Sequence, residues 1–307
     1  MLEETVNVNY EYYRVFYYAA KYQSLTKAAD LLGSNQPNVS RCMSKLEQEL
    51  GCRLLLRSHR GVSLTPEGEL LFSHVQVACE HLQTAEEELS GSRGLETGSV
   101  SIGASETALH VMLLQKMREF RMRYPSIRLQ ITNDSTPQAL AALRGGRVDF
   151  AVVTTPTGAE GPLREVQLGS FQEILVGGPK FSALAARKLT LRELMEFPLI
   201  LLGKETMTYR FYERLFLLHN LSVRADTEAA TADQILPLVK NDLGLGFLPE
   251  PLALDALKRG EVFRIPLAEP IPERHICMVK DSSRILSIAA KEFEKILCGK
   301  TPGAATG

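Results

Sequence analysis

The sequence predicts an α/β fold for most of the chain, preceded by a smaller all-helical unit. Three observations predict this fold class. Residues 1–90 contain short apolar segments at helical spacing, interrupted by residues that cap helices. From Ser99 onward, apolar runs typical of strands alternate with amphipathic helical segments, the pattern of an open α/β sheet. Between the two parts, residues 91–99 are polar and glycine-containing, which is typical of a linker.

Length and charge limit what each part can do. At 307 residues, the chain is too long for one small helical module, and the part after residue 98 suffices for one or two globular units. Lys and Arg number 35 against 36 Asp and Glu, a net charge of −1. Any electrostatic attraction to a polyanion must therefore be local and modest. The affinity is expected to depend on two copies of the binding unit acting together.

Two helices are expected first. The segment 11–22 is apolar at helical spacing. A second helix can begin at Ser24 or Thr26, whose hydroxyls are good N-caps. Gly33 supplies the left-handed residue that ends this helix.

A third helix is expected directly after this glycine. Asn35 is a good N-cap, and Pro37 lies in the first turn, where a missing N–H costs nothing. Apolar residues recur from Val39 to Leu50 at steps of four and three, which makes one buried stripe. The opposite face carries side chains that can reach base edges or phosphates, namely Gln36, Asn38, Ser40, Arg41, Ser44 and Lys45.

A solvated helical face is the alternative to a DNA-reading face. The DNA-reading face is favoured because the turn residues match those of a helix-turn-helix. In addition, amides and hydroxyls outnumber Glu/Lys pairs on this face. A basic hairpin is also expected, with strands at Arg53–Arg57 and Val62–Thr65. A helix of this kind lies in the major groove while the neighbouring elements hold the DNA backbone.

Three stretches in this part carry a family resemblance: LTKAADLL, NQPNVSRCMSKLEQELG, and an R-x-x-R pair followed by LTPEG. With this order and spacing, residues 1–65 resemble the winged helix-turn-helix domain of LysR-type transcriptional regulators. The resemblance implies double-stranded promoter or operator DNA as partner, a phosphate contact from Thr26, and wing contacts near the minor groove from two arginines. Asn35 and Asn38 depart from the residues frequent in the family and are expected to alter which bases are read. The DNA contacts expected in total are Thr26, Asn35, Gln36, Pro37, Asn38, Ser40, Arg41, Lys45, Arg57 and Arg60.

Residues 66–91 are predicted to form a linker helix, and residues 92–98 a hinge. The seam of the helix alternates steps of four and three at Leu71, Val75, Ala78, Leu82, Ala85 and Leu89. Such a seam can pair with a second copy or pack on the chain's own domain. The resemblance favours pairing, since the family places an antiparallel dimerisation helix here, and it implies a homodimer or homotetramer.

Two α/β halves are expected after the hinge. Strands are predicted at 127–132, 148–153 and 274–280, among others, with helices between them. Two such halves with chain crossings between them imply a cleft at the strand ends, where ligands bind. The predicted limits are 99–300 for the region, about 99–167 plus 269–300 for subdomain I, about 168–268 for subdomain II, and 301–307 for a flexible tail.

The pieces GSVSIGAS, FRMRYPSIRLQI, LRGGRVDFAVV and LVKNDLGLGFLPE resemble the LysR-type effector-binding region, which is similar to periplasmic binding proteins. The resemblance implies a small-molecule effector, often one that bears a carboxylate. Hydroxyls beside helix N-termini suit anions, although each one alone can be only a cap or turn residue. The effector contacts expected are Ser105, Thr107, Ser135, Thr136, Thr154, Thr206 and Thr231.

No catalytic, metal or cofactor motif is visible. The 5 cysteines are scattered and lack C-x-x-C spacing. Gly244 and Gly246 match the first two glycines of the dinucleotide-binding motif G-x-G-x-x-G. Pro249 occupies the position of the third glycine, so the motif is not present. No secretory leader and no membrane-spanning stretch is visible, so a cytoplasmic, non-enzymatic protein without cofactor is expected.

These observations together predict an effector-responsive transcriptional regulator. Effector binding in the cleft would change subunit geometry, and with it DNA bending and the access of RNA polymerase. Two alternatives stay open from the residues alone. One is a DNA-binding regulator that needs no effector, and the other is a solute-binding or enzymatic α/β protein whose N-terminal domain only mediates assembly.

Overall fold

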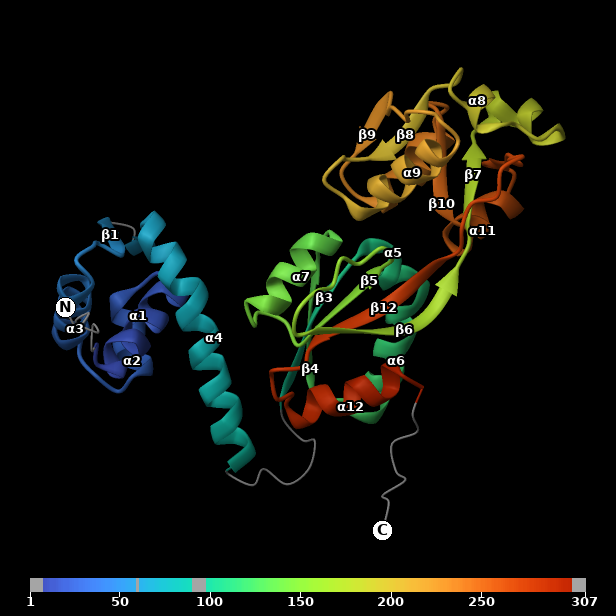
Figure 1. The fold of residues 1–307 in the computed structure, drawn as a ribbon. Coiled ribbons are helices and arrows are strands. Elements are labelled where there is room, and N and C mark those ends of the chain that lie inside the picture. The colour runs from blue at the N-terminus through green and yellow to red at the C-terminus, as the bar shows by residue number, and fades with distance from the viewer. Residues whose placement is uncertain (1–7, 59–60, 90–97, 300–307) are drawn as a thin grey trace, which may run out of the picture. The chain divides into compact units, whose positions relative to one another are not determined.

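The computed structural model describes residues 8–58, 61–89 and 98–299 (Figure 1). The chain divides into two compact units, Met1–Gly91 and Ser92–Gly307. The predicted tail, 301–307, and the predicted hinge apart from Gly98 lie outside the described residues. Within the described part, no helix is long and apolar enough to cross a membrane.

The N-terminal unit is a helical bundle with a β-hairpin. Side chains of Asn9, Ser24 and Asn35 cap its first three helices by accepting backbone N–H groups of the first turn. Gly33, at φ +60°, makes the left-handed turn between the second and third helices. The elements are α1 (Tyr10–Tyr22), α2 (Leu25–Leu31), α3 (Gln36–Leu50), β1 (Leu55–Ser58), β2 (Gly61–Leu64) and α4 (Pro66–Leu89).

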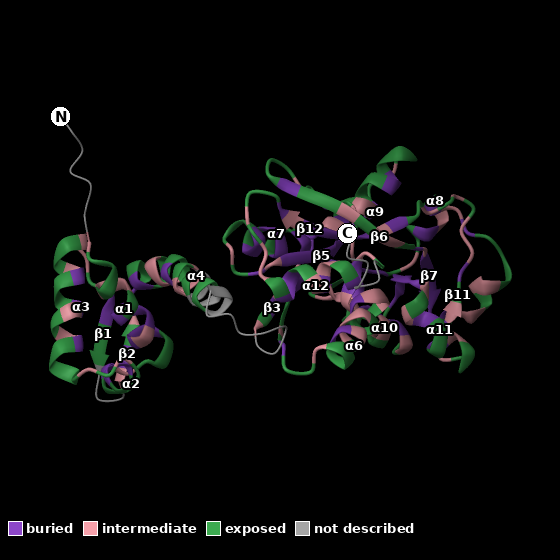
Figure 2. Cartoon of the chain, turned by 90° about the horizontal axis from the view of Figure 1, so that it is seen from below, coloured by how far each residue is buried: buried purple, intermediate pink, exposed green. Residues whose placement is uncertain are grey.

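The core of this unit forms where α1, α2, α3 and the start of α4 meet. Val39, Met43 and Leu46 on α3 are almost fully buried, which confines the exposed residues of this helix to the opposite side. Figure 2 shows the result, with long stretches of α3 exposed and α1 carrying many buried residues. Phe16 lies edge-on to Phe72, which joins α1 to α4.

The hairpin is held to the helices by two polar side chains. Glu47 Oε1 on α3 accepts the N–H groups of Leu54 and Leu55 at 2.8 and 3.1 Å. Thr65 Oγ1 donates to the Arg53 carbonyl at 2.7 Å and accepts the N–H of Gly68 at 3.0 Å. A Cβ at Gly68 would lie 2.1 Å from the Leu54 carbonyl oxygen, so only glycine lets α4 start this close to the hairpin.

The second unit contains two five-stranded sheets, with strand orders β4-β3-β5-β12-β6 and β11-β7-β10-β8-β9. The first sheet consists of β3 (Ser99–Ala104), β4 (Arg128–Asn133), β5 (Phe150–Thr154), β6 (Leu163–Phe171) and β12 (Arg274–Asp281). The second consists of β7 (Glu173–Gly177), β8 (Leu199–Leu202), β9 (Thr227–Ala229), β10 (Leu245–Pro249) and β11 (Phe263–Arg264).

Helices cover both faces of each sheet (Figure 1). In the first sheet, alternate residues of β5 point to opposite faces, so that Phe150 packs with Phe293 of α12, and Val153 with Leu140 of α7. The helices of this half are α5 (Glu106–Ala108), a π-helical turn (Leu109–Leu113), α6 (Leu114–Arg123), α7 (Thr136–Arg144) and α12 (Ile288–Leu297). Those of the other half are α8 (Leu191–Leu194), α9 (Met207–Leu218), α10 (Ile235–Lys240), α11 (Glu250–Lys258) and the 3₁₀ turns Pro179–Ala186 and Ala232–Gln234.

The chain crosses between the halves twice, at Gln172 and again before β12. The Gln172 side chain donates to the Ile271 carbonyl at 3.0 Å and so ties the two crossing segments together. Strand β6 runs on to Phe171, beyond residue 167, where the sequence analysis ends the first half. β6 and β12 pair along their whole length, so both belong to the first sheet.

The parallel strands of both sheets set the position of the polar loops. β4, β3 and β5 run parallel in the first half, as do β9, β8 and β10 in the second. Loops after β3, β4 and β5 carry Ser105, Ser135 and Thr155, and the loop after β8 leads to Thr206. Because the carboxyl ends of parallel strands lie at one edge of a sheet, these hydroxyls gather at the sheet edges.

Candidate nucleic-acid interface and ligand pocket

The polar face of α3 is free of the unit's own packing. Of the predicted contact residues on this element, only Ser40 is half-buried. Asn38 is held by two bonds, since its N–H reaches Asn35 Oδ1 at 2.9 Å and its side-chain amide reaches Ser34 Oγ at 3.0 Å. The exposed ones are Asn35, Gln36, Pro37, Asn38, Arg41 and Lys45.

The cations and hydroxyl around α3 have different constraints. Lys45 Nζ lies 6.0 Å from the centroid of the Tyr12 ring, a weak cation–π contact at an exposed position. Ser24 takes the N-cap role of α2, so exposed Thr26 keeps its hydroxyl free of that role beside the helix N-terminus. Arg57 is exposed on β1, whereas Arg60 lies outside the described residues.

The predicted seam on α4 divides into two parts. Val75 is buried in the core of the unit, and Leu71 is half-buried against the same core. Ala78, Leu82 and Ala85 are exposed, with Leu82 at 46%. The side chain of Leu89 lies outside the described ones. The first part therefore packs on the chain's own domain, and the middle of the helix presents apolar side chains to its surroundings.

A cavity of about 220 Å³ lies between the two halves of the second unit. The first half contributes the loops after its parallel strands and the second half contributes the start of α9 and the loop after β9. All the predicted effector contacts line this cavity, and they are Ser105, Thr107, Ser135, Thr136, Thr154, Thr206 and Thr231.

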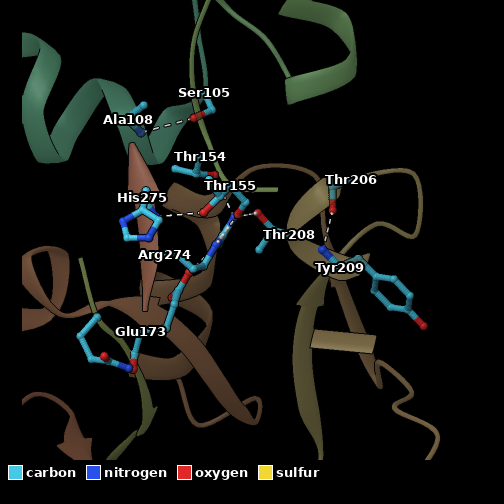
Figure 3. A network of polar contacts seen from close by, with 11 residues as sticks. Ser105, Ala108, Thr154, Thr155, Glu173, Thr206, Thr208, Tyr209, Arg274 and His275 are labelled. Atoms are coloured by element: carbon cyan, nitrogen blue, oxygen red, sulfur yellow. Dashed lines mark hydrogen bonds and ion pairs between the residues drawn. The ribbon is translucent and has the colours of Figure 1, made fainter. Parts of the chain in front are cut away.

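Several helices begin at this cavity, and some of the hydroxyls are engaged as caps. Ser105 Oγ accepts the N–H of Ala108 at 3.4 Å. Thr206 Oγ1 accepts the N–H of Tyr209 at 3.1 Å and donates to the Gly203 carbonyl at 2.7 Å (Figure 3). The only hydroxyl proton of Thr206 is therefore committed to the Gly203 carbonyl, which makes Thr206 a weaker donor to a ligand than its position suggests.

Two other hydroxyls have no such engagement. Thr107 is 7% exposed and Thr136 is 6% exposed, and both line the cavity. In the part of the chain that the structure describes, neither hydroxyl has a hydrogen-bond partner. Both hydroxyls can therefore donate to a ligand in the cavity.

Sequence reasoning missed the charged residue behind the cavity. Arg274, at the start of β12, is 1% exposed, and its guanidinium reaches both halves (Figure 3). It pairs with Glu173 Oε1 at 2.6 Å and donates to the Thr155 carbonyl at 2.9 Å. Its Nη2 donates to the hydroxyls of Thr154 at 2.8 Å and Thr208 at 3.2 Å, both of which line the cavity.

Aromatic rings enclose this ion pair. The Arg274 guanidinium lies 5.5 Å from the Phe171 ring centroid and 4.9 Å from that of Phe211. Burial raises the pKa of neighbouring Tyr212 well above its ordinary value, and the Glu173 carboxylate raises it further. The only sequence signal was an arginine at the edge of an apolar run, which in isolation reads as a strand end.

An exposed helix-turn-helix face, joined in one chain to a two-lobed region with a polar cavity, defines the class of ligand-responsive DNA-binding proteins. Residues 10–69 match the bacterial regulatory helix-turn-helix proteins of the lysR family, and residues 93–298 match the LysR substrate binding domain. The chain belongs to the LysR family of transcriptional regulators. The predicted family, fold class and regulator function are confirmed by these matches.

Individual proteins are similar to this chain over nearly its whole length. An uncharacterized HTH-type transcriptional regulator of Bacillus subtilis, YybE, is 27% identical and covers 94% of this chain and 97% of its own. A probable hydrogen peroxide-inducible genes activator of Streptomyces viridosporus is 28% identical, over 92% of this chain and 90% of its own. A full-length OxyR variant from Pseudomonas aeruginosa shares the fold, with a TM-score of 0.67, 22% identity, and coverage of 95% and 94% of the two chains. Regulators of this family bind DNA and small-molecule effectors and form oligomers.

Proposed function

We propose that this regulator reads promoter DNA with α3 and is controlled by an effector that binds the cavity between the two halves. The observation that carries the proposal is that all seven hydroxyl residues predicted as effector contacts line one cavity. Chance placement of turn residues would scatter them over the surface. Their convergence, with the Thr107 and Thr136 hydroxyls free of other partners within the described residues, fits a ligand site.

For DNA, we assign base contacts to exposed side chains of α3, with Gln36, Arg41 and Lys45 foremost. Amides pair with adenine, and arginine and lysine pair with guanine, in the major groove. Thr26 is assigned to a phosphate and the wing arginines, Arg57 and Arg60, to the neighbouring minor groove. The remaining contacts are proposed at Asn35, Pro37, Asn38 and Ser40.

This assignment predicts the effect of removing two cations. The double variant Arg41→Ala, Lys45→Ala is expected to bind promoter DNA about 100-fold more weakly, since each base contact is worth about 1–3 kcal/mol. Arg192→Ala with Lys258→Ala removes the same charges from exposed positions of the second unit and serves as control. Binding isotherms on a fragment from a strong genomic site measure both. Equal losses in the two double variants would show that net charge, not the α3 face, governs affinity.

For the effector, we propose a small molecule with a carboxylate group. Helix N-termini present unpaired N–H groups and a partial positive charge, and α5, α7 and α9 start at the cavity. Thr107, Thr136 and Thr154 are the hydroxyls best placed to donate to a carboxylate.

For assembly, we propose that the exposed middle of α4 pairs two subunits. Ala78, Leu82 and Ala85 would form the centre of the seam, with Leu89 beyond them. The predicted contacts Val75 and Leu71 are not proposed for pairing, because they pack into the chain's own core. A dimer or tetramer presents two or more copies of α3 to one operator, which compensates for the modest charge of the chain. Effector binding would then alter the spacing of these copies and the access of RNA polymerase, in the cytoplasm and without any catalytic step.

A further inference from the structure

The charges that line the effector cavity are all of one sign. Glu106, Asp134 and Glu205 contribute carboxylates, and no lysine or arginine is among the described residues that line the cavity. A ligand with only negative groups would be repelled by these side chains. The composition of the cavity therefore does not suit a simple carboxylate.

The carboxylates have a regular placement at the helix starts. Glu106 directly follows the cap of α5, while Asp134 and Glu205 directly precede the caps of α7 and α9. Asp134 and Glu205 thus approach the same cavity from opposite halves of the unit.

The three side chains differ in what they already bind. Glu106 accepts the Asn133 side-chain amide at 2.6 Å and contacts His110 Nε2 at 2.7 Å. Asp134 Oδ2 accepts the Thr132 hydroxyl at 2.5 Å. In the part of the chain that the structure describes, neither Asp134 nor Glu205 forms an ion pair. These two carboxylates are therefore available to a cationic group.

Hydroxyls in the same cavity can donate hydrogen bonds to a negatively charged group. Thr107 and Thr136 are more than nine-tenths buried and unpaired within the described residues. Thr154 and Thr208 accept from Arg274 Nη2, so each has its own hydroxyl proton left to donate. Arg274 is itself paired with Glu173, so it adds no net charge behind them. The free hydroxyl protons on this side of the cavity therefore favour a hydrogen-bond acceptor such as a carboxylate.

We propose that the effector is a small zwitterion of the free amino acid class. Its ammonium group binds Asp134 and Glu205, with Glu106 nearby, and its carboxylate binds the hydroxyls and helix starts around Thr107, Thr136 and Thr154. This inference rests on the proposed effector role of the cavity and adds the cationic group to it. Both kinds of lining residue are then used by one ligand of the size that the cavity admits.

The test compares matched ligands on the full-length protein. Each of the twenty common amino acids is titrated calorimetrically beside its desamino acid, for example alanine beside propanoate and leucine beside 4-methylpentanoate. At least one amino acid is expected to bind, and to bind at least tenfold more tightly than its desamino partner. Binding of none of the amino acids, or equal binding of the desamino acids, overturns the proposal.

Variants separate this inference from the proposed function. Glu205→Gln and Asp134→Asn are each expected to weaken the amino acid at least tenfold and its desamino partner not at all. Glu196→Gln, at an exposed position of the same unit, is the matched control. If the desamino acids bind the wild type but not the double variant Thr107→Val, Thr136→Val, the cavity remains the effector site. Only the zwitterion is then rejected. Amino acid binding unaffected by all these variants would place the ligand elsewhere, and both proposals would fail.

Discussion

At the scale of single residues, the cavity shows what sequence can and cannot predict. Ser105, Ser135 and Thr154 were predictable because they lie at or just after the ends of strands that show as apolar runs, whereas Thr231 follows β9, which no apolar run marks. The hydrogen-bonding roles of the hydroxyls were not predictable. Thr206 caps α9 and donates to the Gly203 carbonyl, whereas the Thr107 hydroxyl has no partner within the described residues. Arg274 was missed because its partners Glu173 and Thr154 come together only through the crossings between the halves.

The buried ion pair has a measurable role in stability. Arg274→Leu is expected to lower the free energy of unfolding by about 3–5 kcal/mol, because Glu173 would remain as an uncompensated charge at 3% exposure. Adding Glu173→Leu to this variant is expected to recover part of the loss, since both charges are then gone. Denaturant unfolding followed by circular dichroism measures both variants. A loss below about 1 kcal/mol in the single variant would contradict the role of the pair.

The thiol of Cys277 is predicted to be unreactive. Burial and the neighbouring Glu165 carboxylate raise its pKa to about 12, so the thiol stays protonated at neutral pH. Because the thiolate is the reactive form, alkylation by iodoacetamide should be slow at pH 7 and rise only as the pH approaches that value. Mass spectrometry of the folded protein, with the unfolded chain as the fully reactive control, measures the modification. Fast labelling or peroxide oxidation of folded Cys277 at pH 7 would contradict this.

At the scale of elements, the hydropathy pattern predicted the helices with a regular apolar stripe and missed the strands whose apolar pattern is weak. α1 and α3 follow their apolar stripes, and Asn35 caps α3 as expected. β6 was missed because exposed residues such as Arg164 and Glu165 interrupt its apolar pattern, and its pairing with β12 stabilises it. Short strands such as β9 exist only because β8 offers a parallel partner, which no local signal reveals.

The exposed part of α4 predicts an effect on assembly. Leu82→Glu is expected to shift the protein toward the monomer, because a paired seam would bring two carboxylates into an apolar contact. Leu254→Glu on α11 is the control, since Leu254 is 42% exposed against 46% for Leu82. Analytical ultracentrifugation of both variants gives the distribution of species. An unchanged oligomer in Leu82→Glu would mean that subunits associate through another surface.

At the scale of the whole molecule, the sequence predicted two functional parts and a two-lobed second part. The exact crossings required the structure, because β6 and β12 run from the first sheet straight into the connections. Arg274 lies at one of these crossings and touches side chains that line the cavity. A ligand there can control DNA binding only if it binds the active and inactive arrangements with different affinity.

The most direct measurement of the central claim is promoter occupancy and transcript level, recorded together in the native host across growth conditions. Three strains are compared, carrying the wild type, Arg41→Ala with Lys45→Ala, and Thr107→Val with Thr136→Val. The first double variant is expected to lose its sharp promoter sites. The second is expected to keep those sites while transcription no longer responds to conditions. A Thr107/Thr136 variant that regulates like the wild type, or an Arg41/Lys45 variant that keeps its sites, would contradict the account.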